Sequence, residues 1–324
     1  MKLLIRVFTL SLSLSVLLIL TASASKWRVN NSGIQAGFNS VQQAVSSSQV
    51  LPGDTLYVEG SPFSYGNVDL TKRLVIIGPG YFLGQNPETQ ACLSTAIFEN
   101  IAFNAESDGS FMTGMTVISW TTVQDTGIVL ARNHIGGINL SFPAANCQVL
   151  QNWMELMNIS GSQGNIVSNN LITRDYPSWS GYCFTIDNGS SATVRHNIFG
   201  GCQTVQNCLY ENNVATGTAA GYNNVFTSVN STVRNNLGAS TQFGNTSGNQ
   251  ADVDISTVFI GTGSEDGKYR LLPGSPAAGA GYGGVDCGIF GGSAPYELSG
   301  IPNLPAVGYL NINGNSVTVR ARSH

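Results

Sequence analysis

Aliphatic residues in the middle of the chain recur one or two positions after an asparagine, at intervals near twenty residues. The aliphatics that close this pattern are Ile135, Met154, Leu171, Ile198, Val214, Val225 and Leu237, so successive steps are 19, 17, 27, 16, 11 and 12 residues. The repeat is too short for a pair of helices, and the sequence around it is rich in glycine. Such spacing is typical of a stacked β-solenoid.

The segments between the asparagines have the pattern strand, turn, strand. Residues 109–117 form one such unit, and residues 158–167 form another around a Gly-Ser-Gln-Gly turn. Inward aliphatics of successive rungs would then stack into a narrow core, with each strand paired to its equivalent one rung later.

The asparagines fit the corners of such a solenoid. A sharp corner often needs one residue with positive φ, which asparagine tolerates better than most residues. Side-chain amides stacked along the axis can also form a hydrogen-bonded ladder. We therefore predict that the asparagines mark the corners and form a ladder, and that Arg132, Arg195 and Arg234, which precede them, form a solvated external row.

The two ends of the chain have a different pattern. Apolar residues at 38, 41, 44 and 45 are spaced for one face of a short helix, and strands are expected over 55–58 and 74–77. Near the other end, residues 301–305 are interpreted as an extended linker. Residues 309–322 alternate as a terminal strand pair around Asn313-Gly314.

The order helix, Gly53-Asp54-Thr55 turn, strand and Ile76-Ile77-Gly78 strand end resembles the amino-terminal cap of secreted right-handed parallel β-helix proteins, the pectate-lyase-like group. The stretch 266–296, with its Asp-Gly-Lys-Tyr-Arg-Leu, Gly-Ser-Pro-Ala and repeated glycine motifs, resembles the ending of many bacterial β-helix proteins, especially from Bacteroidetes. The resemblance implies an all-β right-handed parallel β-helix with a short amino-terminal capping helix and a small carboxy-terminal β region. The polysaccharide-active members of the pectate-lyase-like group are lyases, hydrolases and epimerases.

The first 24 residues have the pattern of a secretory signal peptide. Lys2 and Arg6 precede an apolar run over residues 7–20, and the small residues 22–24 provide a cleavage signal. A membrane anchor is the alternative, but the run is shorter than the roughly 20 residues that a span needs. We expect a secreted or cell-surface protein with no transmembrane segment after cleavage. Its predicted parts are a signal peptide (1–24), a cap (25–50), the β-helix (51–298) and a linker with terminal strands (299–324).

Charge and cysteine content narrow the function classes. Without Lys2 and Arg6 the chain has 12 basic and 18 acidic residues, a formal charge of −6, which argues against a nucleic-acid partner. The six cysteines of an exported chain can form disulfides or remain buried thiols, and both interpretations stay open. Their irregular spacing argues against zinc, so no metal site is predicted.

The catalytic motifs of the resembled group are not found. The chain has no run of neighbouring aspartates in the β-helix body, no arginine-rich lyase signature, no lysine between Lys72 and Lys268, and none of the Asn-Thr-Asp, Asp-Asp or Gly-His-Gly motifs of polygalacturonase-like hydrolases. A hidden pair could still come from the body carboxylates, since a glycosidase needs two carboxylates roughly 5 to 10 Å apart. These carboxylates are Glu155, Asp175, Asp187 and Glu211. No cofactor is predicted, and Ca²⁺ is expected only if the chain is a lyase.

The longest step of the repeat contains the candidate binding residues. They are Arg174, Asp175, Tyr176, Trp179 and Tyr182. Aromatic rings together with a guanidinium and a carboxylate suit sugar recognition on a loop that projects from a rigid stack. The alternative is a packed Ω-loop whose Trp179 only covers the core.

The function predicted from the sequence is binding of a polysaccharide or surface glycan through one solenoid face. The alternatives are a divergent polysaccharide lyase or glycoside hydrolase, and an adhesin or structural subunit that binds another envelope protein.

Overall fold

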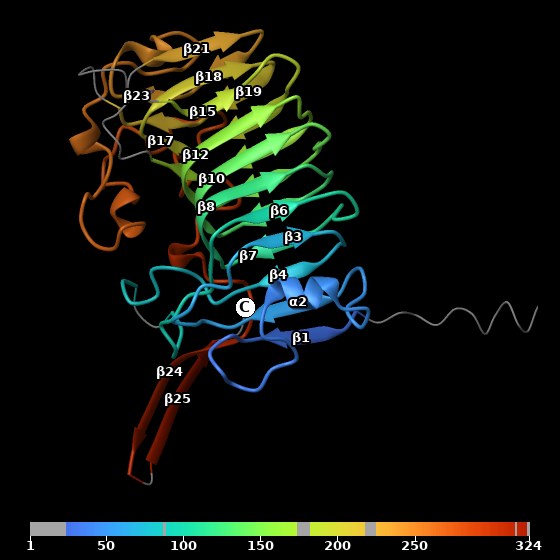
Figure 1. Cartoon of the computed structure of the whole chain (residues 1–324). Coiled ribbons are helices and arrows are strands. Elements are labelled where there is room, and N and C mark those ends of the chain that lie inside the picture. The colour runs from blue at the N-terminus through green and yellow to red at the C-terminus, as the bar shows by residue number, and fades with distance from the viewer. Residues whose placement is uncertain (1–23, 87–88, 174–181, 218–224, 315, 323–324) are drawn as a thin grey trace, which may run out of the picture.

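The computed structural model describes residues 24–86, 89–173, 182–217, 225–314 and 316–322. The chain forms a right-handed parallel β-solenoid of about eight turns, in which successive rungs stack along one axis (Figure 1). The predicted all-β fold class is confirmed. The predicted signal peptide lies almost entirely outside the described residues and stays a prediction.

Two parallel sheets form the walls of the solenoid. The ten-stranded sheet has the order β1 (Lys26–Val29), β2 (Thr55–Val58), β4 (Val75–Ile77), β7 (Phe111–Thr113), β9 (Val129–Ala131), β11 (Gln148–Leu150), β13 (Asn165–Ser168), β16 (Ala192–Arg195), β19 (Cys208–Glu211) and β22 (Thr232–Arg234). The thirteen-stranded sheet contains β3 (Val68–Leu70), β5 (Ile97–Phe98), β6 (Ile101–Phe103), β8 (Thr116–Val123), β10 (His134–Ser141), β12 (Trp153–Ser160), β14 (Leu171–Ile172), β15 (Tyr182–Ile186), β17 (Ile198–Phe199), β18 (Cys202–Gln206), β20 (Val214–Ala215), β21 (Phe226–Val229) and β23 (Leu237–Gly238).

The core is a set of stacked columns between the two sheets. Side chains along each strand of the ten-stranded sheet alternate between the core and the outer face. One inward column is fully buried along eight strands and consists of Leu56, Ile76, Met112, Leu130, Val149, Val167, Val194 and Tyr210. The predicted stacking of aliphatics is therefore confirmed.

A short helix covers the first rungs, as the apolar spacing predicts. Helix α2 spans Val41–Ser46 and begins at Ser40, whose side chain accepts a hydrogen bond from the Gln43 backbone N–H at 3.1 Å. It buries Val41, Ala44 and Val45 against the core. Because a solenoid core is open at its ends, this helix removes apolar surface of the first rungs from water.

The asparagine ladder is present at the corner between the ten-stranded sheet and β14, β17, β20 and β23. In each step the side-chain Nδ2 donates to the Oδ1 of the next asparagine at 3.0–3.1 Å. The members are Asn133, Asn152, Asn170, Asn197, Asn213, Asn236 and Asn249. The match at Val225 is wrong, because the ladder steps directly from Asn213 to Asn236.

The residue with positive φ at each corner is not the ladder asparagine. This corrects the prediction that one asparagine both adopts positive φ and forms the ladder. The left-handed residue directly precedes each of the first six ladder members and is Arg132, Gln151, Asn169, His196, Asn212 or Asn235, with φ between 52° and 59°. Half of these six are not asparagine, so the corner tolerates other side chains at this position. We call these six residues the left-handed column.

The carboxy-terminal part packs against the outside of the solenoid rather than extending it. It contains the short 3₁₀ helices η2 (Thr241–Phe243), η3 (Ile255–Thr257), η4 (Gly267–Tyr269) and η5 (Leu298–Gly300). Its buried apolar residues, including Val258, Ala277 and Ile289, cover the outward residues of β14, β17, β20 and β23. The result is a second hydrophobic layer outside the stack. Figure 1 shows the backbone of this part of the chain along one side of the solenoid.

Residues 279–304, which we call the strap, run back along the corner from the last rungs toward the first. The left-handed column holds it through hydrogen bonds to Ala280, Tyr282, Ile289, Gly291, Ala294, Pro295 and Ile301. Ile301 and Pro302 are buried. The predicted linker over 301–305 is therefore, at its start, part of the packed structure.

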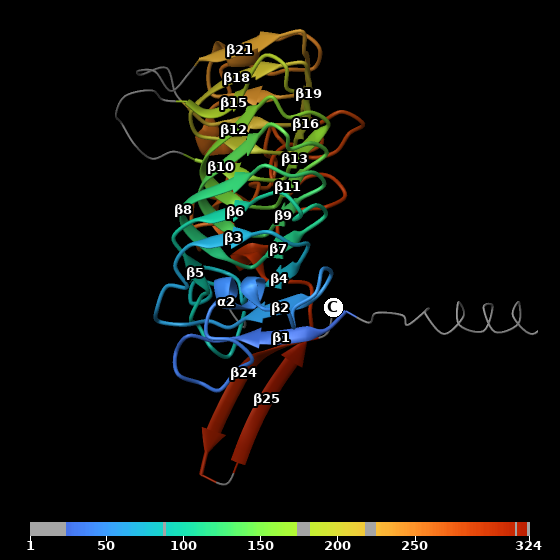
Figure 2. The same ribbon diagram turned by 45° about the vertical axis from the view of Figure 1, so that its right-hand side comes forward.

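Beyond the strap, the predicted terminal strand pair is confirmed. Strands β24 (Ala306–Asn313) and β25 (Ser316–Arg322) form an antiparallel hairpin that projects from the amino-terminal end of the solenoid (Figures 1 and 2).

None of the six cysteines forms a disulfide in the structure, and Cys92 is exposed while the other five are buried. Within the described residues, no helix combines the length and the apolar character that a membrane crossing would require.

Candidate functional site

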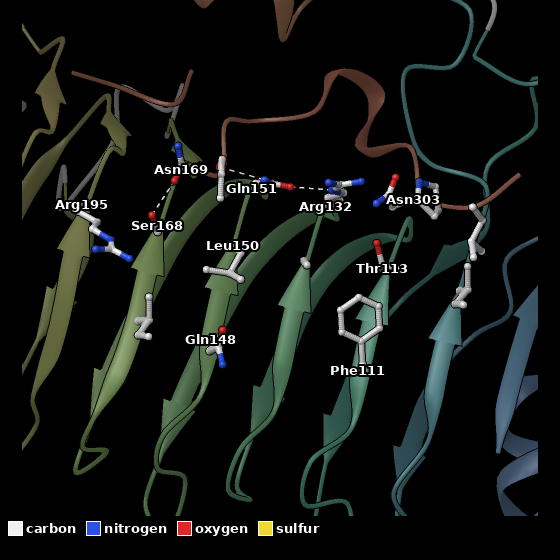
Figure 3. A pocket seen from close by; sticks show the side chains of 16 residues that line it. Phe111, Thr113, Arg132, Gln148, Leu150, Gln151, Ser168, Asn169, Arg195 and Asn303 are labelled. Atoms are coloured by element: carbon white, nitrogen blue, oxygen red, sulfur yellow. Dashed lines mark hydrogen bonds between the residues drawn. The ribbon is translucent and has the colours of Figure 1, made fainter. Parts of the chain in front are cut away.

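A groove of about 460 Å³ lies on the outer face of the ten-stranded sheet, beside the strap (Figure 3). Six successive strands, β4 to β16, form its floor, so it extends over about 24 Å at the usual spacing between strands. The strap provides one wall. The lining residues are Ile77, Phe111, Thr113, Ala131, Arg132, Gln148, Leu150, Gln151, Ile166, Ser168, Asn169, Arg195, Ala294, Pro302, Asn303 and Leu304.

The register of the sheet explains this lining. Outward residues at the carboxyl ends of the strands align in one row, which runs Ile77, Thr113, Ala131, Leu150, Ser168 and Arg195. A second row two residues earlier contributes Phe111, Gln148 and Ile166. The floor therefore combines apolar surface with separated polar groups, as is usual for ligand sites.

The wall side of the groove is held rigidly by the left-handed column. Arg132 donates from Nε to the Gln151 side chain at 2.6 Å and from Nη1 to the Ile301 carbonyl at 3.0 Å. Gln151 in turn donates to the carbonyls of Ala294 and Pro295. Figure 3 shows Arg132, Gln151 and Asn169 aligned beneath the strap. These bonds fix the guanidinium of Arg132 before any ligand arrives.

Two other polar groups of the groove are free to contact a ligand. Neither the amide of Gln148 nor the guanidinium of Arg195 has a hydrogen-bond or ion-pair partner within the described part of the chain. Arg195 is exposed, and Figure 3 places it at the end of the groove, next to the strand of Ser168. Three strand spacings separate Arg195 from Arg132, about 14 Å along the axis. Two cationic groups thus stand at separate positions along one groove.

The prediction of a solvated row of arginines is wrong. Arg132 belongs to the left-handed column and is half-buried, whereas Arg195 and Arg234 belong to the row that ends each strand. Glu211 lies between these two in the row, and its carboxylate pairs with Arg234 at 2.8 Å. Arg234 also lies over the ring of Tyr282, 3.6 Å from its centroid. Arg195 is therefore distinguished from Arg234 by the absence of an ion pair among the described residues.

The candidate carboxylates do not meet in this groove, since none of its lining residues is acidic. Glu211 is occupied by Arg234, and Glu155 lies on β12 of the other sheet. Asp187 is partly desolvated, but hydrogen bonds from Ser160, Ser190 and the Gly161 N–H outweigh this burial and lower its pKa. Asp175 lies outside the described residues. Where the structure describes the chain, no three His, Cys, Asp or Glu side chains gather as a metal site would require.

Most of the predicted binding loop lies outside the described residues. Arg174, Asp175, Tyr176 and Trp179 lie outside the described residues, and only Tyr182 is described. Tyr182 begins β15 on the thirteen-stranded sheet and is 43% exposed. It does not line the groove, which is formed by the other sheet.

The face that carries Tyr182 has features that the sequence did not suggest. One outward row contains Thr122, Asn139, Asn158, Thr185, Thr204 and Thr227, brought together only by strand register. Trp120 is 38% exposed, and its ring lies so close to Gly137 that a Cβ there would approach ring atoms at 2.7 Å. The absent side chain at Gly137 lets the indole lie against the sheet, beside this polar row.

No protein-family model, no curated protein and no solved structure matches this chain. The fold and the geometry of its surfaces are therefore the grounds on which a function can be argued.

Proposed function

We propose that the protein binds a linear, acidic polysaccharide or surface glycan in the groove of the ten-stranded sheet, without transforming it. The observation that carries this proposal is a groove about 24 Å long whose lining includes two arginines and no carboxylate. A groove of this length accommodates several units of an extended polymer. On the strength of the predicted signal peptide, we place this activity outside the cell or at its surface.

The chemistry of the lining favours a sugar polymer with acidic groups. Phe111, Leu150 and Ile166 offer apolar surface against which the C–H faces of sugar rings can lie, and Gln148 offers a free amide to hydroxyl groups. Guanidinium groups bind carboxylates and sulfates through paired hydrogen bonds. Because Arg132 and Arg195 are about 14 Å apart along the axis, they suit two acidic groups on one chain better than a single small anion.

Binding is favoured over turnover by the composition of the groove. Acid–base cleavage of a glycosidic bond requires a positioned pair of carboxylates, and elimination requires a positioned base. The described residues of the groove supply guanidinium and amide groups, but no such pair.

The first experiment is a screen of residues 25–324 against uronate-containing and neutral polysaccharides, with and without Ca²⁺. Retention on the glycan and the appearance of new unsaturated products or reducing ends are recorded together. We expect retention on acidic chains, weakened by salt, and no product. Product formation would replace this proposal with the lyase or hydrolase alternative, and the absence of retention would remove glycan binding altogether.

Two single substitutions test the groove itself. Arg195→Gln should weaken affinity for an acidic glycan about tenfold, because a charge-assisted hydrogen bond is lost. Arg234→Gln is the matched control: it removes the same charge from the same row, outside the groove and from an existing ion pair. Equal losses in both variants would indicate a general charge effect, and the groove assignment would then be dropped.

We retain Trp179 and Tyr182 as a second glycan contact. Of these two, Tyr182 is described, and it lies on the face that also presents Trp120. The support is the exposure of Tyr182 and Trp120 next to a polar row, an arrangement suited to ring stacking and hydroxyl contacts. Replacing Trp179 and Tyr182 together by alanine should reduce glycan retention. Unchanged retention would remove the loop from the proposal and leave the groove.

A further inference from the structure

One member of the left-handed column, His196, contacts the strap without a direct hydrogen bond to it in the described structure. The other five side chains bond backbone groups of the strap, at positions from Ala280 to Ile301. The ring of His196 packs instead against Gly291 and Gly292, where a Cβ would approach ring nitrogens at 2.9 and 2.8 Å. Because both positions lack a side chain, the strap backbone lies directly on the imidazole, which is only 6% exposed.

The hydrogen bonds of Asn212 determine which ring nitrogen of His196 carries the proton. Asn212 Oδ1 accepts from the backbone N–H of Tyr282 in the strap at 2.7 Å, so its Nδ2 is the atom that faces His196 Nε2, at 3.2 Å. An amide Nδ2 can only donate, and Nε2 therefore accepts and carries no hydrogen. The proton of the neutral ring is on Nδ1, which has no hydrogen-bond partner among the described residues. The hydrogen bonds that link His196 to the strap through Asn212 thus require a neutral imidazole.

A second proton on the ring is incompatible with these hydrogen bonds. Nε2 would become a donor that faces another donor, the Nδ2 group of Asn212. Rotating the amide of Asn212 would restore the bond to His196, but it would turn Nδ2 toward the N–H of Tyr282 and break the bond to the strap. Since Asn212 is also buried, no water can reach between these groups while the strap is in place. The conflict is relieved only when the strap moves away and water hydrates the charged ring.

The charged groups around the ring are Arg195, Glu211 and Asp286. Burial, followed by the guanidinium of Arg195, lowers the pKa of His196 from its ordinary value of 6.5. The backbone carbonyl and carboxylate of Asp286 and the carboxylate of Glu211, which is paired with Arg234, act in the opposite direction without reversing the shift. The closed strap therefore binds this proton less tightly than the open strap. The stability of the closed form is fully present above about pH 6.5 and is lost as pH falls below this value.

We propose that His196 is a pH switch that keeps the strap closed on the solenoid at neutral pH and releases it when the ring is protonated in mild acid. Release begins where the strap lies on the ring and on Asn212, over residues 279–292. The strap continues from there into the wall of the groove, at Ala294 and residues 302–304. Protonation of His196 therefore loosens this wall and makes the shape of the groove depend on the acidity of its surroundings. This holds whatever ligand the groove binds.

The buried thiol of Cys287 reports release of the strap directly. Cys287 lies in the strap, is 1% exposed, and has its Sγ 3.3 Å from the carbonyl oxygen of Asn235. Burial raises the pKa of this thiol to about 12, so it is unreactive while the strap is closed. Labelling of the protein with dithiodipyridine, which also reacts with thiols in mild acid, is followed for each cysteine by peptide mass spectrometry. The exposed Cys92 corrects for the effect of pH on the reagent, and Cys147 in the solenoid core reports unfolding of the whole protein.

His196→Gln is the matched variant, because glutamine already occupies this column at Gln151 with the same backbone conformation. Its side-chain carbonyl can accept from Asn212, and it does not titrate. From pH 7.5 to pH 5.5, labelling of Cys287 should accelerate about tenfold in the wild type and change by less than about twofold in His196→Gln. The proposal would be overturned by a wild-type rate that does not depend on pH, by equal acceleration in His196→Gln, or by rapid labelling of this variant at both pH values. Acceleration of Cys147 together with Cys287 would also overturn it, since the whole solenoid would then be unfolding.

A second variant, His134→Phe, removes the other histidine that the structure describes. This variant keeps His196 and the strap unchanged, so it does not depend on how well the glutamine fits. Its Cys287 labelling rate should still rise about tenfold for each unit that the pH falls below 6.5, which is the response to a single proton. A rate that is independent of pH in His134→Phe would assign the response to His134 and would overturn the proposal.

Discussion

Two neighbouring columns of residues at the same corner of the solenoid behave in opposite ways. The ladder is built from asparagine throughout, whereas the left-handed column directly before it contains arginine, glutamine, histidine and asparagine. Each ladder member contacts another asparagine of the ladder, so every position has the same requirement. Each left-handed residue contacts a different part of the strap, so every position has its own requirement. The same residue therefore recurs at a corner position when its contact partner is the same on every rung. Sharing the same backbone conformation is not enough to make the residue recur.

The largest effect is expected inside the ladder. Asn170 donates to the carbonyls of Val149 and Ser168, and its Oδ1 accepts from the backbone N–H of Asn152. Asn170→Ala leaves these buried backbone groups without partners and should lower the free energy of unfolding by about 3–5 kcal/mol. Urea unfolding of the wild type and of Asn170→Ala measures this difference in the free energy of unfolding. If the loss were no larger than that of a substitution in the left-handed column, the ladder would not be the dominant contribution at this corner.

A medium effect is expected one residue beyond the ladder, where His134 points outward into a cluster with Tyr81, Phe82 and Trp153. Burial lowers the pKa of His134 to about 4 from its ordinary value near 6.5. The unfolded chain therefore binds a proton between these two values that the folded chain rejects, and stability decreases as pH falls through this window. From pH 7 to pH 5 this one group should reduce the free energy of unfolding by about 2 kcal/mol.

His134→Phe supplies the comparison, since phenylalanine keeps the packing and cannot titrate. The difference between the two proteins in urea unfolding at pH 7 and pH 5 isolates the histidine from the other titrating groups. An equal response of both proteins would mean that His134 is not shielded from water as its burial implies.

The smallest effect is expected in the left-handed column. Asn169 donates to the carbonyls of Ile289 and Gly291 at 2.8 Å. Asn169→Gly removes both bonds but keeps easy access to positive φ, so the loss should be about 1 kcal/mol. Limited proteolysis should show faster cleavage within the strap while the solenoid stays intact. Uniform destabilisation of the whole protein would mean that strap and solenoid unfold as one unit.

The sequence predicts the ladder well because one chemical requirement recurs at each rung. Its failures have physical reasons. Asn249 joins the ladder although no aliphatic residue follows it, since it comes from a turn rather than a rung. Val225 matches the pattern, yet it does not follow a ladder asparagine in the sequence, because the ladder steps from Asn213 to Asn236. A local motif shows that a segment has residues suited to a corner. Whether the segment joins the ladder depends on its pairing with the next rung.

The groove could not be predicted in the same way. Gln148, Ser168 and Arg195 share no motif, and strand register alone aligns their rows. Its wall comes from Ala294 and residues 302–304, which follow the last floor residue, Arg195, by about a hundred positions in the chain. The carboxy-terminal pattern gives no sign that this segment returns along the corner. The distinction between Arg195 and Arg234 likewise depends on which of them Glu211 pairs with.

The way the ladder ends bears on how long this solenoid can grow. Each interior asparagine offers its backbone N–H to the next asparagine, so each rung requires a successor, as in fibrils that add subunits without limit. Asn249 instead donates its N–H to Thr246, in the same turn. At the other end the ladder begins where the Met115 N–H binds Asn133, with Gly114 in the left-handed position. The asparagine ladder is thus terminated at both ends. Another copy of the chain stacked on either end would not find an asparagine positioned to continue the ladder.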